Sequence, residues 1–167
     1  MIRFDYINHG EATFEIKERI CTIKDTSWHH GIKNQMQWLE SHLKDTDIHL
    51  MAYTEGGLVA YLNLIDLNIA IDGKTKKALG IGNVCSAEKG IGYGKMLVEE
   101  VNVYLNKHNK IGILLCKQNL VNFYNKYNWS LIDKSRIVFS AFQMDTIEIM
   151  CYNLESFTKL SLLDGSF

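Results

Sequence analysis

The sequence predicts an α/β fold in which a mixed, mostly antiparallel sheet of about seven strands is flanked by helices on both faces. Three observations support this prediction: stretches with a two-residue hydrophobic period, amphipathic stretches with helical spacing, and Gly, Asn and Asp turns between them. The expected order of elements along the chain is β-α-α-β-β-β-α-β-α-β-β. Such an order combines hairpins with strand–helix–strand connections, which is typical of a mixed sheet.

The bulk properties are those of one ordinary domain. No linker, repeat or low-complexity tract divides the 167 residues, so we expect a single domain over residues 1–167. The chain is 47% hydrophobic and 22% charged with a net charge of -1, which favours neither a nucleic-acid nor a membrane partner. No apolar run is long enough to span a bilayer, and the first residues lack a signal-peptide pattern. A cytoplasmic location is therefore expected.

The cysteines predict neither disulfides nor a metal site. They stand far apart, at positions 21, 85, 116 and 151, and none forms a C-x-x-C pair. His29 and His30 are adjacent within an expected helix and so point apart, which argues against a metal pair. We expect four reduced, structural cysteines and no bound metal.

The first part of the chain predicts one strand and two helices. Residues 2–7 alternate apolar and polar side chains, and helical spacing follows from about 11 to 23. A clearer amphipathic helix runs from Trp28 to Leu43, with Asp25-Thr26-Ser27 as its N-cap candidates.

An antiparallel meander follows. The expected strands cover residues 48–54, 58–71 and 76–86. Gly56-Gly57 and Asp72-Gly73 join them, and both pairs tolerate the positive φ angles of tight hairpin turns.

The last part of the chain alternates helices and strands. Helices are expected at about 92–106 and 119–127, and strands at 111–116, 129–133, 137–142 and 146–153.

The most informative segment is the glycine-rich turn that joins the third meander strand to the next helix. Gly90, Gly92 and Gly94 have no Cβ, so the backbone can approach a ligand closely. The helix start offers unpaired N–H groups and the positive end of the helix dipole, and Lys89 and Lys95 add charge. These features together predict a site for phosphate oxygens.

Two common phosphate motifs do not fit this turn. A Walker A loop requires a glycine where Lys89 stands and a Ser or Thr where Met96 stands. The dinucleotide pattern G-x-G-x-x-G fits neither from Gly80 nor from Gly90.

The turn instead resembles the acetyl-CoA turn of the GNAT superfamily, R/Q-x-x-G-x-G/A, as Lys89-x-x-Gly92-x-Gly94 with Lys in place of Arg or Gln. The segment Asn119 to Trp129 is similar to the second signature of that family, N-x-x-A-x-x-F/L-Y-x-K-x-G-F. Asn122 departs from the small residue of the signature. Asn128 replaces its glycine, at a helix end where Asn tolerates left-handed geometry. The resemblance covers about residues 48 to 134.

The resemblance implies an N-acetyltransferase that uses acetyl-CoA as co-substrate and transfers its acetyl group to a primary amine by direct attack in a ternary complex. In the family, backbone amides of the turn hold the CoA pyrophosphate, the preceding strand pairs with pantetheine, and a Tyr at the position of Tyr124 protonates the departing thiolate. A backbone N–H of that strand, at Val84 or Cys85, would contact the thioester carbonyl. The implied cofactor-binding residues are Val84, Cys85, Lys89, Gly90, Gly92, Tyr93, Gly94, Lys95 and Asn119.

Several alternatives stay open at this level. The general base is Asp66, His49 or a water relay. If they have no catalytic role, His49 and Asp66 are interpreted as surface or edge residues. The acceptor is a small-molecule or peptide amine, and the acyl chain is acetyl or longer. A non-catalytic acyl-CoA-binding or regulatory module would retain the same turn. The apolar tail 157–167 suggests a surface for a second copy, so a homodimer is also open.

Overall fold

The computed structural model describes residues 1–140 and 146–164, and the side chains of 139 and 140 are not described. Within these residues the chain forms four α-helices and nine β-strands, a mixed α/β fold with a mostly antiparallel sheet. It divides into two compact units. The first contains residues 1–65 and 82–97, and the second contains residues 66–81 and the described residues after Leu97.

The first unit is built on an antiparallel sheet. β1 (Arg3–Asn8) pairs with β2 (Ile48–Thr54), and β2 pairs with the first part of β3 (Gly57–Ile71). The end of β4 (Lys74–Ser86) belongs to the same unit. In β2 and the first part of β3 several consecutive side chains are buried, so side chains on both faces of these strands are covered.

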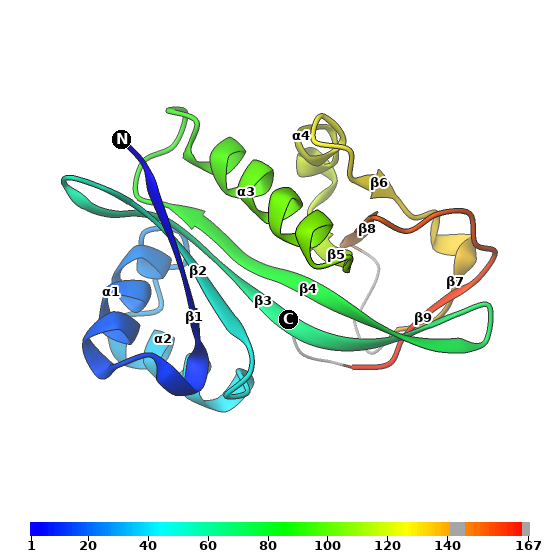
Figure 1. Ribbon diagram of the computed structural model, residues 1–167, viewed down its shortest axis with the longest axis horizontal. Helices are drawn as coiled ribbons and strands as arrows, with labels where there is room; N and C mark the ends of the chain where they lie inside the picture. Colours follow the sequence, from blue (N-terminus) through cyan, green and yellow to red (C-terminus); the bar gives the residue numbers. More distant parts are fainter. Residues whose placement is uncertain (141–145, 165–167) are drawn as a thin grey trace. The chain divides into compact units, whose positions relative to one another are not determined.

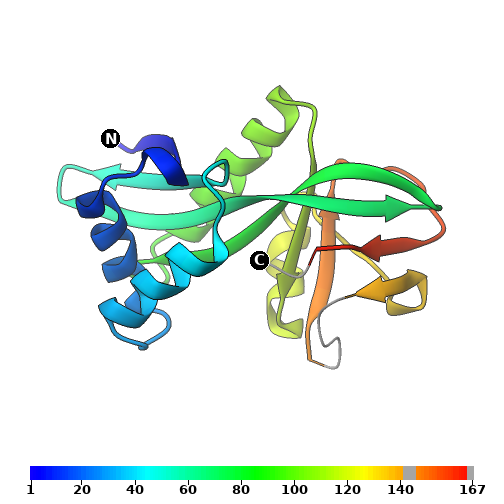
Figure 2. The same cartoon turned by 90° about the horizontal axis from the view of Figure 1, so that it is seen from below.

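Two helices cover one face of this sheet. α1 (Phe14–Asp25) and α2 (Ile32–His42) lie side by side in Figures 1 and 2. The Thr13 hydroxyl accepts a hydrogen bond from the Ile16 N–H at 3.3 Å and caps α1. The helices are held to the sheet by fully buried side chains such as Ile20 and Leu39.

The expected N-cap of α2 is wrong. Asp25 is the last residue of α1, and α2 begins only after Gly31, which has a φ of 81°. The Asp25 carboxylate accepts a hydrogen bond from the Gly31 N–H at 2.7 Å and so shapes the loop between the helices. Trp28, His29 and His30 therefore lie in this loop and not on a helix.

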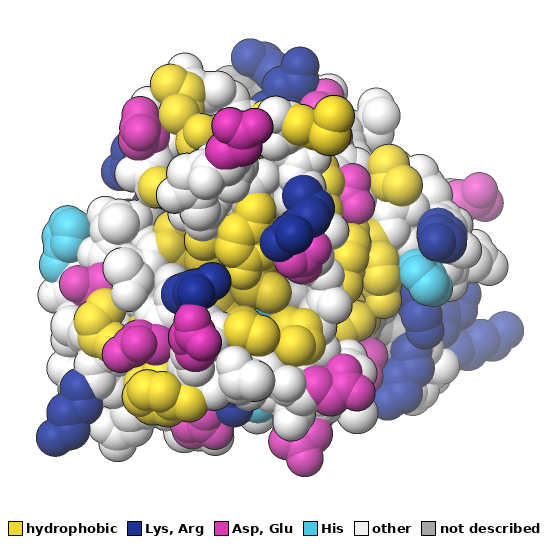
Figure 3. Space-filling model, turned by 60° about the vertical axis from the view of Figure 1, so that its left-hand side comes forward, with side chains coloured by type: hydrophobic (Ala, Val, Ile, Leu, Met, Phe, Trp, Pro, Cys, Tyr) yellow, Lys and Arg dark blue, Asp and Glu magenta, His cyan; other side chains and the backbone are white. Residues whose placement is uncertain are grey.

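Figure 3 shows one face of the molecule, on which basic and acidic side chains are interspersed around hydrophobic ones. Ion pairs between such neighbours include Arg3 with Asp5 at 2.9 Å and Arg19 with Glu15 at 2.6 Å. Because these pairs are exposed, each contributes at most about 1 kcal/mol to stability.

The second unit contains the rest of the sheet. The second part of β3 continues into β4, β4 pairs in parallel with β5, and β8 lies antiparallel between β5 and β6. β9 pairs with β3 and β7. The bounds are Ile111–Cys116 for β5, Ser130–Leu131 for β6, Ile137–Ser140 for β7, Glu148–Tyr152 for β8 and Leu160–Leu162 for β9. The helices are α3 (Tyr93–Lys107), whose first turn lies in the other unit, and α4 (Val121–Asn125).

Two predicted turn geometries are confirmed. Asp72 and Gly73 have φ angles of 48° and 80°, as a tight hairpin between β3 and β4 requires. Asn128, the residue at the glycine position of the second signature, has a φ of 65°. Asn128 therefore has left-handed geometry at the end of the segment after α4, as predicted.

The carboxyl-terminal part differs from the prediction. β9 was not expected, and α4 is shorter than the predicted helix because residues 118–120 form a 3₁₀ turn. Leu160 and Leu162 are buried in β9, so these apolar residues of the tail pack within their own chain. The last two residues of the strand predicted at 137–142, and residues 165–167 of the tail, lie outside the described residues.

Gly112→Ala is expected to destabilise the protein. A Cβ at Gly112 would lie 2.6 Å from Cη2 of Trp129 and 2.7 Å from Cδ1 of Leu105. The Trp129 ring cannot shift freely, because its Nε1 donates a hydrogen bond to Asn102 Oδ1 at 2.9 Å. We expect a loss of roughly 1–3 kcal/mol in the free energy of unfolding, measured by urea denaturation.

Gly56→Ala is the matched control, since its Cβ would meet only Thr54 Oγ1, at 3.6 Å. Equal denaturation midpoints for the two variants would mean that the strand adjusts to the added methyl group.

Candidate functional site

The glycine turn is open and conformationally specialised. Gly90 and Gly92 have φ angles of 85° and 95°, which side chains with a Cβ rarely adopt. A Cβ at either position would meet nothing within 4 Å, so the space beside the backbone is free. The structure therefore requires glycine here for backbone geometry, and not to avoid a neighbouring atom.

The start of α3 lies directly after this turn. The first intrahelical bond runs from the Met96 N–H to the Gly92 carbonyl at 3.1 Å, so the amides just before Met96 have no partner within the helix. The first turn of α3 contains no acidic residue, while Lys89 and Lys95 are exposed beside it. This combination favours an anion.

β4 is irregular just before the turn. Asn83 has a φ of 54° inside the strand, and its Nδ2 donates a hydrogen bond to Asn63 Oδ1 at 3.0 Å. A non-glycine residue in left-handed geometry within a strand is typical of a bulge. β4 pairs with β5 from Ala78 to Ile81. Val84 and Cys85 thus lie beyond the part of β4 that pairs with β5.

The cysteines are free, as predicted, and buried. Burial raises the pKa of the Cys85 thiol to about 12 and that of Cys116 to about 11. Both thiols are therefore protonated at neutral pH, which agrees with a packing role and not with nucleophilic catalysis.

Tyr124 lies in α4 of the second unit and is 6% exposed. Burial, followed by the nearby Cys116, raises its pKa to about 12, so the phenol is protonated at neutral pH. Its ring packs against Phe123 and Trp129, with centroids 5.0 and 6.5 Å away. Among the residues that the structure describes, none forms a hydrogen bond with the Tyr124 hydroxyl. Asn119 lies exposed in the 3₁₀ turn before α4.

The two candidate bases have very different surroundings. His49 is fully buried, so its interpretation as a surface or edge residue is wrong. Its Nε2 lies 3.0 Å from Nδ1 of His9 and its Nδ1 lies 2.7 Å from the Tyr61 hydroxyl. Burial lowers the pKa of His49 to about 3, which leaves an enclosed, neutral ring. Asp66 is exposed on β3.

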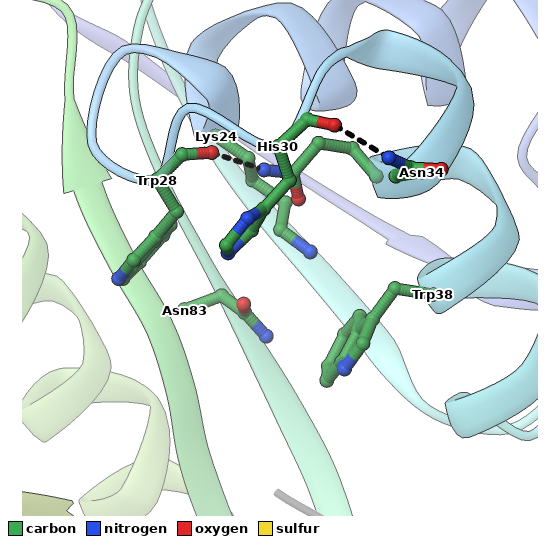
Figure 4. Close-up of a pocket in the computed structure, with 7 residues that line it drawn as sticks. Lys24, Trp28, His30, Asn34, Trp38 and Asn83 are labelled. Atoms are coloured by element: carbon green, nitrogen blue, oxygen red, sulfur yellow. Dashed lines mark hydrogen bonds between the residues drawn. The ribbon is translucent and has the colours of Figure 1, made fainter.

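A cavity of about 370 Å³ lies in the first unit and was not predicted from the sequence (Figure 4). It is formed by the end of α1, the following loop, α2 and the irregular part of β4. Its lining residues are Lys24, Trp28, His30, Asn34, Gln35, Trp38 and Asn83. One signal was available: Lys24 follows the buried Ile20 by four residues and therefore lies on the inner face of α1.

The family model described as an acetyltransferase (GNAT) domain matches residues 11–132, a range that includes every predicted site residue. The chain belongs to this GNAT family. No curated protein matches the sequence. Over the part of the chain described, no helix combines the length and hydropathy that a membrane span requires.

Solved structures share the GNAT fold. An acyl-CoA N-acyltransferase from Pseudomonas aeruginosa has a TM-score of 0.67 at 20% identity, covering 90% of this chain and 99% of its own. The GNAT N-acetyltransferase YhbS from Escherichia coli, solved with CoA, has a TM-score of 0.65 at 15% identity, covering 97% of this chain and 88% of its own. An aminoglycoside 6'-N-acetyltransferase with coenzyme A has a TM-score of 0.61 at 11% identity, covering 91% of this chain and 98% of its own. At such identities the likeness concerns the fold.

Proposed function

We propose that this GNAT protein transfers the acetyl group of acetyl-CoA to a primary amine by direct attack in a ternary complex. The observation that carries the proposal is the open turn at Gly90 and Gly92, which leads into the first turn of α3, before the first intrahelical bond at Met96. A pyrophosphate fits this arrangement because it offers several anionic oxygens to backbone N–H groups. The structures of YhbS and of the aminoglycoside acetyltransferase with CoA support the choice of ligand.

Each cofactor-binding residue has a specific part in the proposal. The turn and the first residues of α3 would bind the pyrophosphate through Gly90, Gly92, Tyr93 and Gly94, with Lys89 and Lys95 supplying positive charge. Val84 and Cys85, which lie beyond the part of β4 that pairs with β5, would pair with the pantetheine arm. One of their N–H groups would donate to the thioester carbonyl as negative charge develops there.

The chemistry requires two proton movements. The neutral amine attacks the thioester carbon, the C–S bond breaks, and the sulfur leaves as a thiolate. Tyr124 would give its phenolic proton to that thiolate, since its raised pKa keeps it protonated at neutral pH. The amine would lose its proton to Asp66 or through water, because His49 is enclosed and has a strongly lowered pKa.

The test is amine-dependent release of CoA. The protein is incubated with acetyl-CoA and a panel of amino acids, polyamines, aminoglycosides and peptide N-termini, while free thiol and acetylated product are measured. We expect thiol release to match product formation for at least one class of amine, and to stay at the background rate without amine. Binding of acetyl-CoA without turnover of any amine would instead favour a non-catalytic acyl-CoA-binding module.

A further inference from the structure

Lys24 is a buried cation on the inner face of α1. It lies in the last turn of α1 and is 2% exposed, although fully buried lysines are nearly always paired. Its ammonium lies 4.0 Å from the centroid of the Trp38 ring. Among the described residues, no carboxylate forms an ion pair with Lys24 and no side chain or carbonyl accepts a hydrogen bond from it.

The surroundings of Lys24 leave its charge uncompensated. Burial lowers its pKa to about 8, so the ammonium is still mostly charged at neutral pH. The nearby titratable groups that interact with it electrostatically are the thiols of Cys21 and Cys85 and the neutral ring of His49. The pKa values of the two thiols are raised to about 11 and 12, so both thiols are neutral. A cation–π contact with Trp38 offsets only part of the cost of burying the charge.

The cavity beside Lys24 is complementary to an anion. None of its lining residues is acidic, and its volume of about 370 Å³ is at the lower end of the range for small-molecule sites. The indoles of Trp28 and Trp38 stand on either side of the opening in Figure 4 and give it apolar walls.

Two hydrogen bonds preform this cavity. Gln35 Nε2 donates to the Trp28 carbonyl at 2.7 Å, and Asn34 Nδ2 donates to the His30 carbonyl at 2.8 Å (Figure 4). The loop is thereby fixed to α2, so a ligand would not have to order it.

Asn83 adds a hydrogen-bond acceptor to the opposite wall. Its Nδ2 donates to Asn63 Oδ1, and among the described residues no group donates a hydrogen bond to Asn83 Oδ1, so this oxygen can accept one from a ligand. Asn83 directly precedes Val84 and Cys85, the residues proposed to contact the thioester. An amine bound near Asn83 would therefore lie next to the segment proposed to hold the acyl group.

We infer that this cavity binds an amino acid whose carboxylate pairs with Lys24, whose amine approaches Asn83, and whose side chain packs on the two indoles. That the bound amino acid is the acetyl acceptor rests on the proposed function. The binding itself does not.

The test uses the intact protein without acetyl-CoA. L-leucine, L-phenylalanine and the corresponding amides are titrated while tryptophan fluorescence and the melting temperature are recorded. We expect the carboxylates to bind at least about tenfold more tightly than the amides, since only they supply the counter-ion. Trp28 and Trp38 line the cavity, so binding should change the fluorescence.

Lys24→Met keeps most of the length of the unbranched side chain and removes the charge. The preference for carboxylates should disappear, and the ligand-free melting temperature should rise because an unpaired buried charge is removed. Lys33→Met is the matched control: Lys33 is exposed on α2 and does not line this cavity, so both properties should stay unchanged.

The outcomes separate this inference from the proposed function. Equal binding of acids and amides, or no response to any of the four compounds, would overturn the inference. A lower melting temperature of Lys24→Met with unchanged preference would show that Lys24 only packs on Trp38, which also overturns it. Carboxylate binding without thiol release from acetyl-CoA would uphold the site and refute the transferase. Thiol release that is equal for acids and amides and insensitive to Lys24→Met would uphold the transferase and refute the amino-acid site.

Discussion

Tyr124→Phe is expected to lower kcat by roughly 100-fold, the effect typical of losing a general acid, while the affinity for acetyl-CoA changes little. The substitution removes only the hydroxyl, which forms no hydrogen bond with any residue that the structure describes. The ring would keep its edge contacts with Phe123 and Trp129, so the stability should be nearly unchanged. Single-turnover measurements with acetyl-CoA would isolate the chemical step.

Tyr127→Phe is the matched control for this loss. Tyr127 also contacts Phe123, at 5.3 Å between ring centroids, but has no part in the proposed chemistry, so its kcat should stay at the wild-type value. A thioester with a more acidic thiol should restore part of the rate to Tyr124→Phe, because its leaving group needs no proton. If kcat of Tyr124→Phe stays within about threefold of wild type, where loss of an acid should cost more than about 2 kcal/mol, the proton comes from another group.

Gly92→Glu is expected to abolish the rise in melting temperature that acetyl-CoA causes through ligand linkage. The new carboxylate would lie at the start of α3, where the proposed pyrophosphate binds, and would repel it. Because a Cβ at Gly92 would meet no atom within 4 Å, the substitution creates no clash that should unfold the protein.

Gly92→Ala separates charge from backbone strain. It imposes the same strain at a φ of 95° without adding an anion, so we expect acetyl-CoA to retain more of its stabilising effect than in Gly92→Glu. The ligand-free melting temperatures of both variants establish that they are folded. Unchanged acetyl-CoA affinity in a folded Gly92→Glu protein would refute the cofactor site.

The sequence predicted those parts of the fold whose signals are local. The bounds of β2 and β5 match the predicted ranges because apolar alternation and turn residues define them within a few positions. Trp28 has helical spacing with the residues of α2 but lies in a loop, because Asp25 binds the Gly31 N–H and delays the helix. β9 has three residues, and its strand character depends on pairing with the distant β3, which no local pattern reveals.

The same distinction applies to the candidate site. The glycine turn is a contiguous motif, so its residues could be anticipated from the sequence, whereas the positive φ angles of Gly90 and Gly92 were not predicted. The cavity brings together Lys24, Trp38 and Asn83 from α1, α2 and β4, and only the tertiary structure makes them neighbours. His49 was misjudged for a related reason, since its burial depends on His9 and Tyr61 on neighbouring elements.

The asparagines in left-handed geometry also affect stability through the conformational entropy of the unfolded chain. Asn83, Asn109, Asn128 and Asn153 all have positive φ angles, at positions where glycine would be the easier choice for the folded backbone. An unfolded asparagine explores fewer backbone conformations than glycine, so folding costs less conformational entropy at each position, by up to about 1 kcal/mol where the native geometry is unstrained. At Asn83 the choice has a second consequence. The residue that bends β4 also supplies a carboxamide to the cavity, which glycine in the same bend would lack.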